Sequence, residues 1–311
     1  MTIKVGISSC LVGEKVRYDG GHKRSAFCDE ELRRHMQLVP YCPEMGIGLP
    51  APRPSIRLEG EVGNPQAVIP KTGVHVTQGL ADFATQRRNQ FTQLSGYVLC
   101  AKSPSCGMQR VRVYTPGSNI NDKAGMGIFA KRLQEMFPAL PMEEDGRLND
   151  PLLRENFVLR VYVYHAWQQL LPNLKIADLQ AFHAQQKFLL LAHNQPVYRR
   201  LGRELAEQTS LSDAFAIYYI ETLMAALTTP ASRKNNTNVL QHIQGFFKDY
   251  LDSLERQELA ELILEYNQGK VPLMAPLTLI NHYLRKHPNE YLQQQSFLRP
   301  YPNDLGLRYG I

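Results

Sequence analysis

Hydrophobic residues in the first half of the chain come in short runs that are separated by turns. The runs predict buried strands over residues 4–10, 38–42 and 96–100. Between them, apolar positions at helical spacing predict helices around residues 80–94 and 127–137, the second of which stops at Pro138. Because strands that alternate with helices favour parallel pairing, we expect an α/β fold with a largely parallel, Rossmann-like sheet.

The second half of the chain keeps a helical pattern with few breaks. Apolar positions predict helices over residues 153–171, 176–193, 197–208, 212–228, 238–252, 254–267 and 275–286. Ser212 and Ser253 are typical N-caps with an acid in the first turn, residues 229–237 indicate a polar loop, and residues 289–311 predict an ordered but irregular segment. A boundary near Asp150-Pro151 gives an α/β domain over residues 1–150 and an all-helical domain over residues 151–311.

Composition excludes several classes of protein. The 311 residues are 43% hydrophobic and 21% charged, which is typical of a chain that buries a core and not of a disordered one. No apolar run approaches a membrane span, and the N-terminus is too short and strand-like for a signal peptide, so we expect a cytoplasmic protein. The net charge of +6 permits a nucleic-acid partner, but its division between the halves, +4 and +2, does not locate one.

The five cysteines are an odd number and all precede residue 107, which argues against a disulfide framework. Three of them, Cys10, Cys42 and Cys106, follow strand-like segments and have turn residues nearby. Thiols at the carboxyl ends of parallel strands can converge at one sheet edge, where they suit a soft metal or an iron–sulfur cluster with one open iron. Cys28 and Cys100 are expected in the core, since free cysteine is often buried.

A different interpretation of Cys106 is a phosphatase loop, because Cys106 and Arg112 have the Cys-x5-Arg spacing. Such a loop needs a following helix whose N-terminus binds the anion. Residues 111–115 instead alternate like a strand, which disfavours this interpretation.

Polar residues next to the candidate ligands are candidates for catalysis or substrate binding. Glu44 follows Cys42 by two residues and is a candidate general base. Ser103 and Ser105 flank Pro104 in a loop that offers hydroxyl or amide donors to a developing anion. The remaining candidates near these positions are polar or aromatic side chains, namely Arg17, Tyr18, Asp19 and Lys102.

These residues lie in motifs that resemble the thiouracil desulfidase family over residues 1–150. The motifs are Cys10-Leu-Val-Gly13, Arg17-Tyr-Asp-Gly20, Cys42-Pro-Glu44 and Lys102-Ser-Pro-Ser-Cys-Gly107. The resemblance implies a 4Fe-4S cluster held by Cys10, Cys42 and Cys106, with one iron open for the substrate sulfur. It further implies that Glu44 is the acid/base residue and Ser103 the catalytic serine, with Ser105 close enough to compete for that role. The reaction it implies is non-redox, with water replacing sulfur on the ring carbon.

The second half resembles the YbgA-type helical domain, through Gln186-Lys-Phe-Leu-Leu-Leu-Ala-His193, Tyr198-Arg-Arg-Leu-Gly202 and Leu298-Arg-Pro-Tyr-Pro302. The fused architecture is similar to desulfidases that remove sulfur from 4-thiouridine in tRNA, which is the main function we expect. Two alternatives stay open: a desulfidase of free thiolated bases such as 2-thiouracil, and a non-catalytic RNA-binding protein with structural zinc.

A tRNA-binding surface has one weak candidate in the second half, because cations attract phosphates and an unstacked base can lie on a tyrosine. The candidate residues are Lys187, His193, Tyr198, Arg199 and Arg200. An ordinary solvated helix face explains the same residues. His183 and His193 are expected to be surface or core histidines rather than ligands, and Trp167 is expected in the core.

Overall fold

The computed structural model describes residues 2–309, apart from the side chains of residues 303 and 309, and it divides into two compact units, Met1–Asp150 and Pro151–Ile311. The division falls at the boundary expected from the sequence. In the part of the chain that the structure describes, no helix is long and apolar enough to cross a membrane.

The first unit contains a parallel sheet of four strands in the order β2-β1-β6-β9. These strands are β1 (Lys4–Ser8), β2 (Gln37–Tyr41), β6 (Gly96–Leu99) and β9 (Met142–Glu144). Every neighbouring pair runs parallel, with Val5 opposite Leu38 and also opposite Gly96. The predicted parallel sheet is therefore confirmed, with the three predicted strands present and β9 added at one edge.

A second sheet, which the sequence pattern did not predict, has the order β5-β4-β3-β7-β8. Its strands are short: β3 (Arg57–Glu59), β4 (Gln66–Ile69), β5 (Val74–His75), β7 (Val111–Tyr114) and β8 (Asn121–Gly125). Strands β3 and β7 pair parallel, and the other pairs are antiparallel. The unit is thus α/β with one parallel and one mixed sheet.

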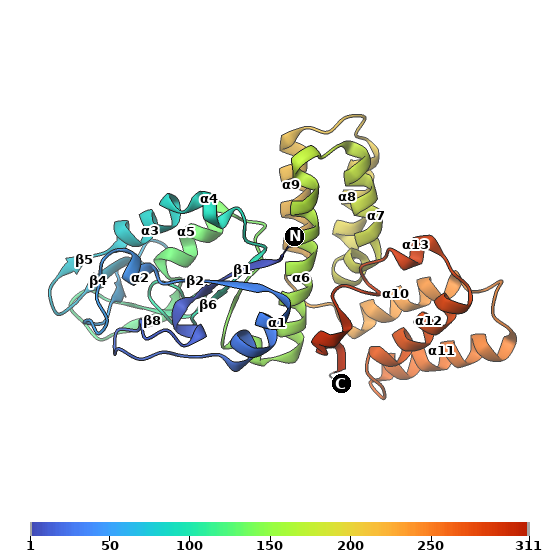
Figure 1. Ribbon diagram of the computed structural model, residues 1–311, viewed down its shortest axis with the longest axis horizontal. Coiled ribbons are helices and arrows are strands. Elements are labelled where there is room, and N and C mark those ends of the chain that lie inside the picture. The colour runs from blue at the N-terminus through green and yellow to red at the C-terminus, as the bar shows by residue number, and fades with distance from the viewer. Residues whose placement is uncertain (1, 310–311) are drawn as a thin grey trace. The chain divides into compact units, whose positions relative to one another are not determined.

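The two longest helices of this unit lie together on one side of the strands (Figure 1). The predicted helix over residues 80–94 is divided into α3 (Thr77–Gln86) and α4 (Arg88–Phe91), and α5 (Ile128–Met136) matches the other prediction. The remaining helical segments are η1 (Ser9–Val12), a π-helix η2 (Phe27–Leu32), α1 (Arg33–His35), α2 (Pro43–Gly46) and η3 (Arg147–Asn149).

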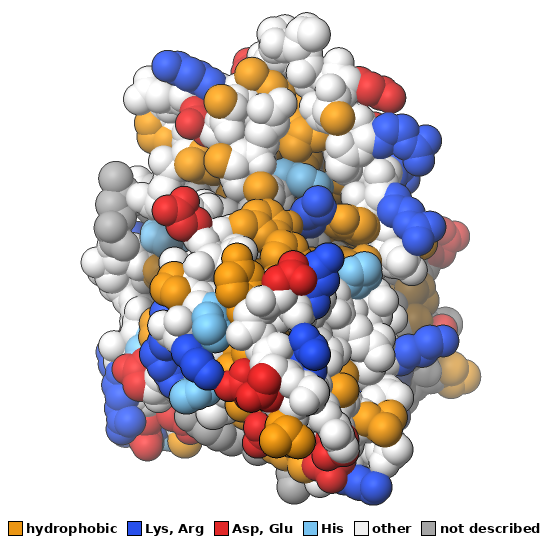
Figure 2. All heavy atoms as spheres, turned by 90° about the vertical axis from the view of Figure 1, so that its right-hand side faces the viewer, with side chains coloured by type: hydrophobic (Ala, Val, Ile, Leu, Met, Phe, Trp, Pro, Cys, Tyr) orange, Lys and Arg blue, Asp and Glu red, His pale blue; other side chains and the backbone are white. Residues whose placement is uncertain are grey.

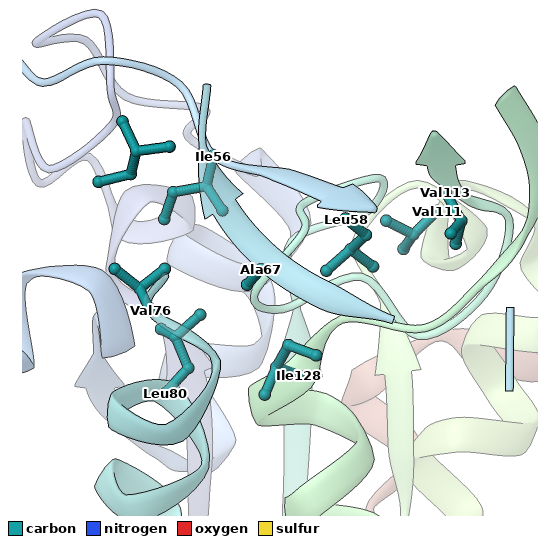
Figure 3. Close-up of a cluster of buried hydrophobic side chains, with 9 residues drawn as sticks. Ile56, Leu58, Ala67, Val76, Leu80, Val111, Val113 and Ile128 are labelled. Atoms are coloured by element: carbon teal, nitrogen blue, oxygen red, sulfur yellow. The ribbon is translucent and has the colours of Figure 1, made fainter. Parts of the chain in front are cut away.

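Two groups of apolar side chains form the core of the first unit. Aromatic rings of Tyr41, Phe91, Tyr97 and Phe129 pack with centroids 5.0 to 6.3 Å apart between the parallel sheet and the helices. Aliphatic side chains of the mixed sheet meet those of α3 and α5, as Figure 3 shows for Leu58, Leu80 and others. Fully burying one such side chain contributes roughly 1.5–3 kcal/mol.

The second unit is helical throughout, as the sequence predicts (Figure 1). Its helices are α6 (Pro151–Leu170), η4 (Leu171–Asn173), α7 (Ile176–His193), α8 (Gln195–Ala206), α9 (Asp213–Ala226), α10 (Arg233–Gly245), α11 (Ser253–Gln268), α12 (Met274–Lys286), α13 (Glu290–Gln293), η5 (Asn303–Leu305) and η6 (Leu307–Tyr309). Trp167 is 3% exposed and its ring contacts Phe182 and Tyr219, so its expected place in the core is confirmed.

Three local predictions in this unit were wrong. The helix expected over residues 238–252 is α10, which spans Arg233–Gly245 and ends seven residues earlier than predicted. The polar segment 229–237 is a loop only as far as Ser232, whose hydroxyl caps α10 by accepting from the amide of Asn235. Helix α11 is capped by Asp252 rather than Ser253, because Asp252 and Glu255 form a reciprocal capping box. The Ser212 cap of α9 is confirmed by its hydrogen bond from the amide of Phe215. The segment after α12 contains only short helices, and residues 310–311 lie outside the described residues.

Candidate active site

Three cysteines meet at the carboxyl edge of the parallel sheet because their strands are neighbours. Cys10 lies in η1 directly after β1, Cys42 follows β2 and caps α2, and Cys106 lies in the loop after β6. Strand β1 lies between β2 and β6 in the sheet, so the three segments leave it side by side. This is the edge at which parallel sheets bind ligands.

The thiols of Cys10, Cys42 and Cys106 influence one another electrostatically. Cys10 and Cys106 are buried and Cys42 is half-buried. Burial raises the pKa of the Cys42 and Cys106 thiols, and a hydrogen bond to Cys100 together with burial raises that of Cys10. The three thiols at this edge therefore stay protonated unless a positive charge lies nearby and takes the place of their protons.

Cys100 does not lie in the core, which corrects its expected place. Strand β6 ends at Leu99, so Cys100 belongs to the turn and is partly exposed. Its amide donates to Ser8 Oγ at 3.0 Å, and its thiol contacts that of Cys10 through a hydrogen bond that lowers the pKa of Cys100. The edge thus carries four thiols. Cys28, by contrast, is fully buried as expected.

Glu44 is held beside the thiols by two side chains, one of which the sequence analysis did not single out. Arg53 donates from Nε at 2.8 Å and from Nη2 to Glu44 Oε2, and Ser105 Oγ donates to Glu44 Oε1 at 2.8 Å. The Arg53 side chain is 3% exposed and also donates to the carbonyls of Val16 and Pro50. The carboxylate is therefore fixed in position. The one signal for Arg53 in the sequence is its position between two prolines, which indicates a rigid backbone at that point.

Ser103 has a different environment from Ser105. Its hydroxyl oxygen accepts hydrogen bonds from the amides of Ser105 and Cys106, at 3.2 and 3.1 Å. Ser103 is half-buried, whereas Ser105 is fully buried. Because the Ser103 oxygen already accepts two bonds, its hydroxyl proton is available to a group in the site.

The loop that carries Ser103, Ser105 and Cys106 packs on the N-terminal end of α5. The amide of Ala130 donates to the carbonyl of Ser105, and the amide of Gly127 donates to that of Gly107. A Cβ at Gly127 would lie 2.5 Å from the Ser105 carbonyl oxygen, so only glycine permits this approach. Lys102 begins the loop in the left-handed region at φ 64° and is exposed.

Basic side chains approach the thiols from the segment after η1. Arg17 and Lys23 both interact electrostatically with Cys10 and Cys100. Arg17 also pairs with Asp19 at 3.5 Å and lies 5.7 Å from the exposed ring of Tyr18, while Lys23 pairs with Asp145 at 2.8 Å. The structure thus brings Arg17 near the candidate ligands and Tyr18 beside Arg17, and their expected contact with substrate stays a prediction.

The phosphatase-loop interpretation of Cys106 fails on the segment that follows. Residues Val111–Tyr114 form β7, and Arg112 points to solvent from that strand. The helix that would bind a phosphate is therefore missing from its place after the loop.

The candidate RNA-binding residues are spread over α7 and α8 and differ in exposure. Arg199 and Arg200 are exposed, and Lys187 and Tyr198 are half-buried. Burial lowers the pKa of His193 to about 4, and its ring nitrogens face Leu189 O at 2.9 Å and Asn156 Nδ2 at 3.4 Å, so it is neutral at pH 7. On the face shown in Figure 2, basic and acidic side chains are interspersed.

Comparison with known proteins agrees with both units. Residues 5–145 match the family model of 2-thiouracil desulfurase, and residues 187–302 match that of a protein family of unknown function, DUF1722. The Escherichia coli (strain K12) protein YbgA is 35% identical over 159 residues, which cover 50% of this chain and 94% of YbgA. A solved structure, the [4Fe-4S]-dependent thiouracil desulfidase TudS, is 27% identical with a TM-score of 0.39, covering 48% of this chain and 94% of TudS.

The two family matches fall on the two structural units, so each unit has its own relatives. The chain belongs to the family of YbgA, and it joins a 2-thiouracil desulfurase domain to a DUF1722 domain.

Proposed function

We propose that the first unit is a 4Fe-4S-dependent desulfidase of small thiolated pyrimidines such as 2-thiouracil. The observation that carries this proposal is a carboxylate, Glu44, bonded to Ser105 at 2.8 Å beside cysteines from three neighbouring parallel strands. A hydrolytic desulfuration needs a sulfur-binding centre and a base, and this edge of the sheet offers residues for both. The match to the 2-thiouracil desulfurase family supports the choice of substrate class.

The donor set suits such a cluster. Cys10, Cys42 and Cys106 supply three thiols, the number that leaves one iron open. Among residues 2–309, no three side chains of Cys, His, Asp or Glu lie together so that they could hold a single metal ion. The ligands of an iron–sulfur cluster lie farther apart, because the cluster between them contains several atoms. Among the described residues, the buried hydroxyl of Tyr97 has no hydrogen-bond partner, and it lies within electrostatic reach of these thiols, so a bound sulfur would satisfy it.

A 4Fe-4S cluster held by Cys10, Cys42 and Cys106 would supply a Lewis-acidic iron that polarises the C–S bond of the substrate. Glu44 orients a water toward the ring carbon and takes its proton, because Oε1 keeps a lone pair beyond the bond from Ser105. Arg53 holds the other oxygen, Oε2, and so fixes the direction of attack. Ser103 donates its hydroxyl proton to the pyrimidine substrate as negative charge develops on the pyrimidine ring.

The reaction balances without an electron donor or acceptor. Water contributes the oxygen that replaces sulfur on the ring carbon, and its two protons leave with the sulfide. The products are uracil and hydrogen sulfide in equal amounts. Arg17 and Lys23 lie near the thiols and attract the departing anion.

Removal of sulfur from 4-thiouridine in tRNA stays a prediction. The observation that favours it is the exposed pair Arg199 and Arg200 at the middle of α8, which have no acidic partner among the described residues. An enzyme that acts on a base inside folded tRNA must also expose that base. We therefore treat tRNA as the second candidate substrate.

The test is anaerobic reconstitution followed by incubation with 2-thiouracil or with bulk tRNA. We expect a coloured protein that releases uracil and sulfide in a one-to-one ratio. A colourless protein that binds zinc as tightly as iron would instead support the non-catalytic alternative. Zinc sites are colourless because the d shell of Zn²⁺ is full. Loss of 4-thiouridine from tRNA without turnover of 2-thiouracil would make tRNA the substrate.

A further inference from the structure

A cavity of about 190 Å³ lies in the helical unit between α12 and the segment that follows α13. Residues 274, 277, 278, 281 and 285 of α12 line it, and their spacing of three or four places them on one helix face. Residues 298–301 and 307–308 form the opposite wall. The cavity belongs to neither group of candidate residues described above.

The lining of this cavity is cationic. It includes Arg285, Arg299 and Arg308, and no Asp or Glu. Arg308 is fixed, because Nε pairs with Glu155 at 2.8 Å and Nη1 donates to the carbonyl of Phe297. Arg285 and Arg299 are exposed, and neither has an ion pair within the described part of the chain. Two guanidinium groups therefore remain for an anion, and their planar geometry suits phosphate.

Asn281 adds a second requirement for the ligand. Its Nδ2 donates to the carbonyl of Leu277 at 2.8 Å, whereas its Oδ1 is buried and has no partner among the described residues. A buried acceptor without a partner is unfavourable, so a ligand N–H at this place would be favoured. Asn281 lies one turn from Arg285 on the same face, which separates the two groups by about 6 Å along the helix.

The other end of the cavity is apolar. Met274 and Leu277 lie toward the start of α12, and Leu298 faces them from the opposite wall. A ligand that matches the whole lining has an anionic group, an N–H donor and a flat apolar surface. The volume is below the roughly 300–1,000 Å³ of drug-sized sites, so the ligand is a single small unit.

We propose that this cavity binds one pyrimidine nucleotide, with its phosphate on Arg285 and Arg299 and its base N–H on Asn281 Oδ1. The choice of a nucleotide among phosphorylated ligands rests on the proposed function of the first unit. The nucleotide is either free or a terminal residue of RNA, since both carry the same groups.

The test is calorimetric titration of the full chain, without reconstitution, with uridine 5′-monophosphate, inorganic phosphate and a short 5′-phosphorylated RNA. We expect saturable binding of uridine 5′-monophosphate that weakens at least tenfold in Arg285→Ala and in Arg299→Ala. Asn281→Leu should also weaken the binding, because this side chain of similar size has no oxygen to accept the base N–H. Tighter binding of the RNA would identify RNA as the source, and tighter binding of the free nucleotide would exclude it.

Lys286→Ala is the matched control, because Lys286 neighbours Arg285 but pairs with Glu255 outside the cavity. Its affinity should stay within twofold of the parent chain. The proposal would be overturned if Lys286→Ala lost as much affinity as the arginine variants. It would also be overturned if no binding were seen at millimolar nucleotide, or if inorganic phosphate bound as tightly as uridine 5′-monophosphate. Because the nucleotide carries no sulfur and no turnover is measured, these results are independent of the desulfidase assignment.

Discussion

Ser105 Oγ donates a hydrogen bond of 2.8 Å to Glu44 Oε1, which joins the loop after β6 to the helix after β2. The two residues are 61 positions apart in the sequence. The contact fixes one carboxylate oxygen beside the thiols, while Arg53 fixes the other. The expected reaction therefore depends on two loops keeping their relative position.

Glu44→Gln should lower kcat by about 10²–10⁴-fold, the usual range for loss of a general base. The amide keeps the size of the carboxylate and still accepts from Ser105, but it cannot take a proton from water. Cluster content should stay unchanged, as measured by iron analysis and visible absorbance. A variant that retains full turnover would remove Glu44 from the mechanism.

The two serines should differ when each is changed to alanine. Ser103→Ala removes the acceptor for the amides of Ser105 and Cys106, so it should accelerate loss of the cluster as well as lower kcat. Ser105→Ala leaves the ligand loop bonded but frees Glu44 Oε1, so it should lower kcat about tenfold with the cluster retained. The measurements are the rate of bleaching by an iron chelator and the rate of sulfide release. The reverse pattern would assign the ligand-loop role to Ser105.

The four thiols at the sheet edge should not be equivalent. Cys10→Ala, Cys42→Ala and Cys106→Ala should each abolish cluster assembly, whereas Cys100→Ala should assemble a cluster with the parent iron content. The reason is that Cys10, Cys42 and Cys106 follow three neighbouring strands of the sheet, whereas the Cys100 thiol bonds to that of Cys10 and would compete with it for the same iron. Iron and sulfide analysis after reconstitution decides this. A Cys100→Ala chain without iron would make Cys100 a ligand.

Tyr97→Phe should change stability in opposite directions with and without the cluster. In the metal-free chain the buried hydroxyl has no partner among residues 2–309, so its removal should stabilise the first unit by about 1 kcal/mol. In the reconstituted chain the hydroxyl gains a sulfur acceptor, so the variant should lose iron faster and its cluster should have a shifted reduction potential. Urea unfolding and potentiometric titration measure the two effects. Equal shifts in both forms would place the hydroxyl out of reach of the cluster.

The helical unit should lose stability between pH 6.5 and pH 4. The pKa of His193 falls from 6.5 to about 4 on folding, because of burial. Below pH 6.5 the unfolded chain therefore binds a proton at this residue that the folded chain excludes, and His193 alone lowers the free energy of unfolding by up to about 3 kcal/mol, at 1.36 kcal/mol per pKa unit. His183 acts in the same direction, because burial lowers its pKa to about 4 as well.

Trp167 is the single tryptophan of the chain and lies in the core of the helical unit, so its fluorescence reports this unfolding. His193→Gln should show a smaller loss of stability with pH than the parent chain. His282→Gln, at an exposed position of α12, should retain the parent dependence. An unchanged slope in His193→Gln would contradict the assignment.

Periodicity predicted the long elements well, because they bury continuous apolar faces. Strands β1, β2 and β6 and helix α7 begin and end within about two residues of their expected limits. Within the mixed sheet only residues 111–115, which include β7, gave such a signal. Strand β8, with the sequence Asn-Asp-Lys-Ala-Gly, has a single buried residue and therefore no alternation to detect.

The parts of the site that could not be predicted depend on where strands end and on contacts far apart in sequence. Cys100 looked like the last residue of a buried strand, but the strand ends one residue earlier and turns its side chain toward Cys10. Arg53 reaches Glu44 only because the intervening segment folds back. Ser103 and Ser105 are chemically identical, and only their hydrogen bonds distinguish them.

The order of the strands also has a consequence for the stability of the chain when iron is scarce. Cys10, Cys42 and Cys106 are separated by 31 and 63 residues, and their strands must pair before the thiols meet. A cluster bound to all three would tie these loops together, as a crosslink does, and would lower the entropy of the unfolded chain. Iron limitation would then lower the stability of the first unit and leave that of the helical unit unchanged. In iron-poor cells the same polypeptide would therefore have a folded helical unit and an unstable first unit.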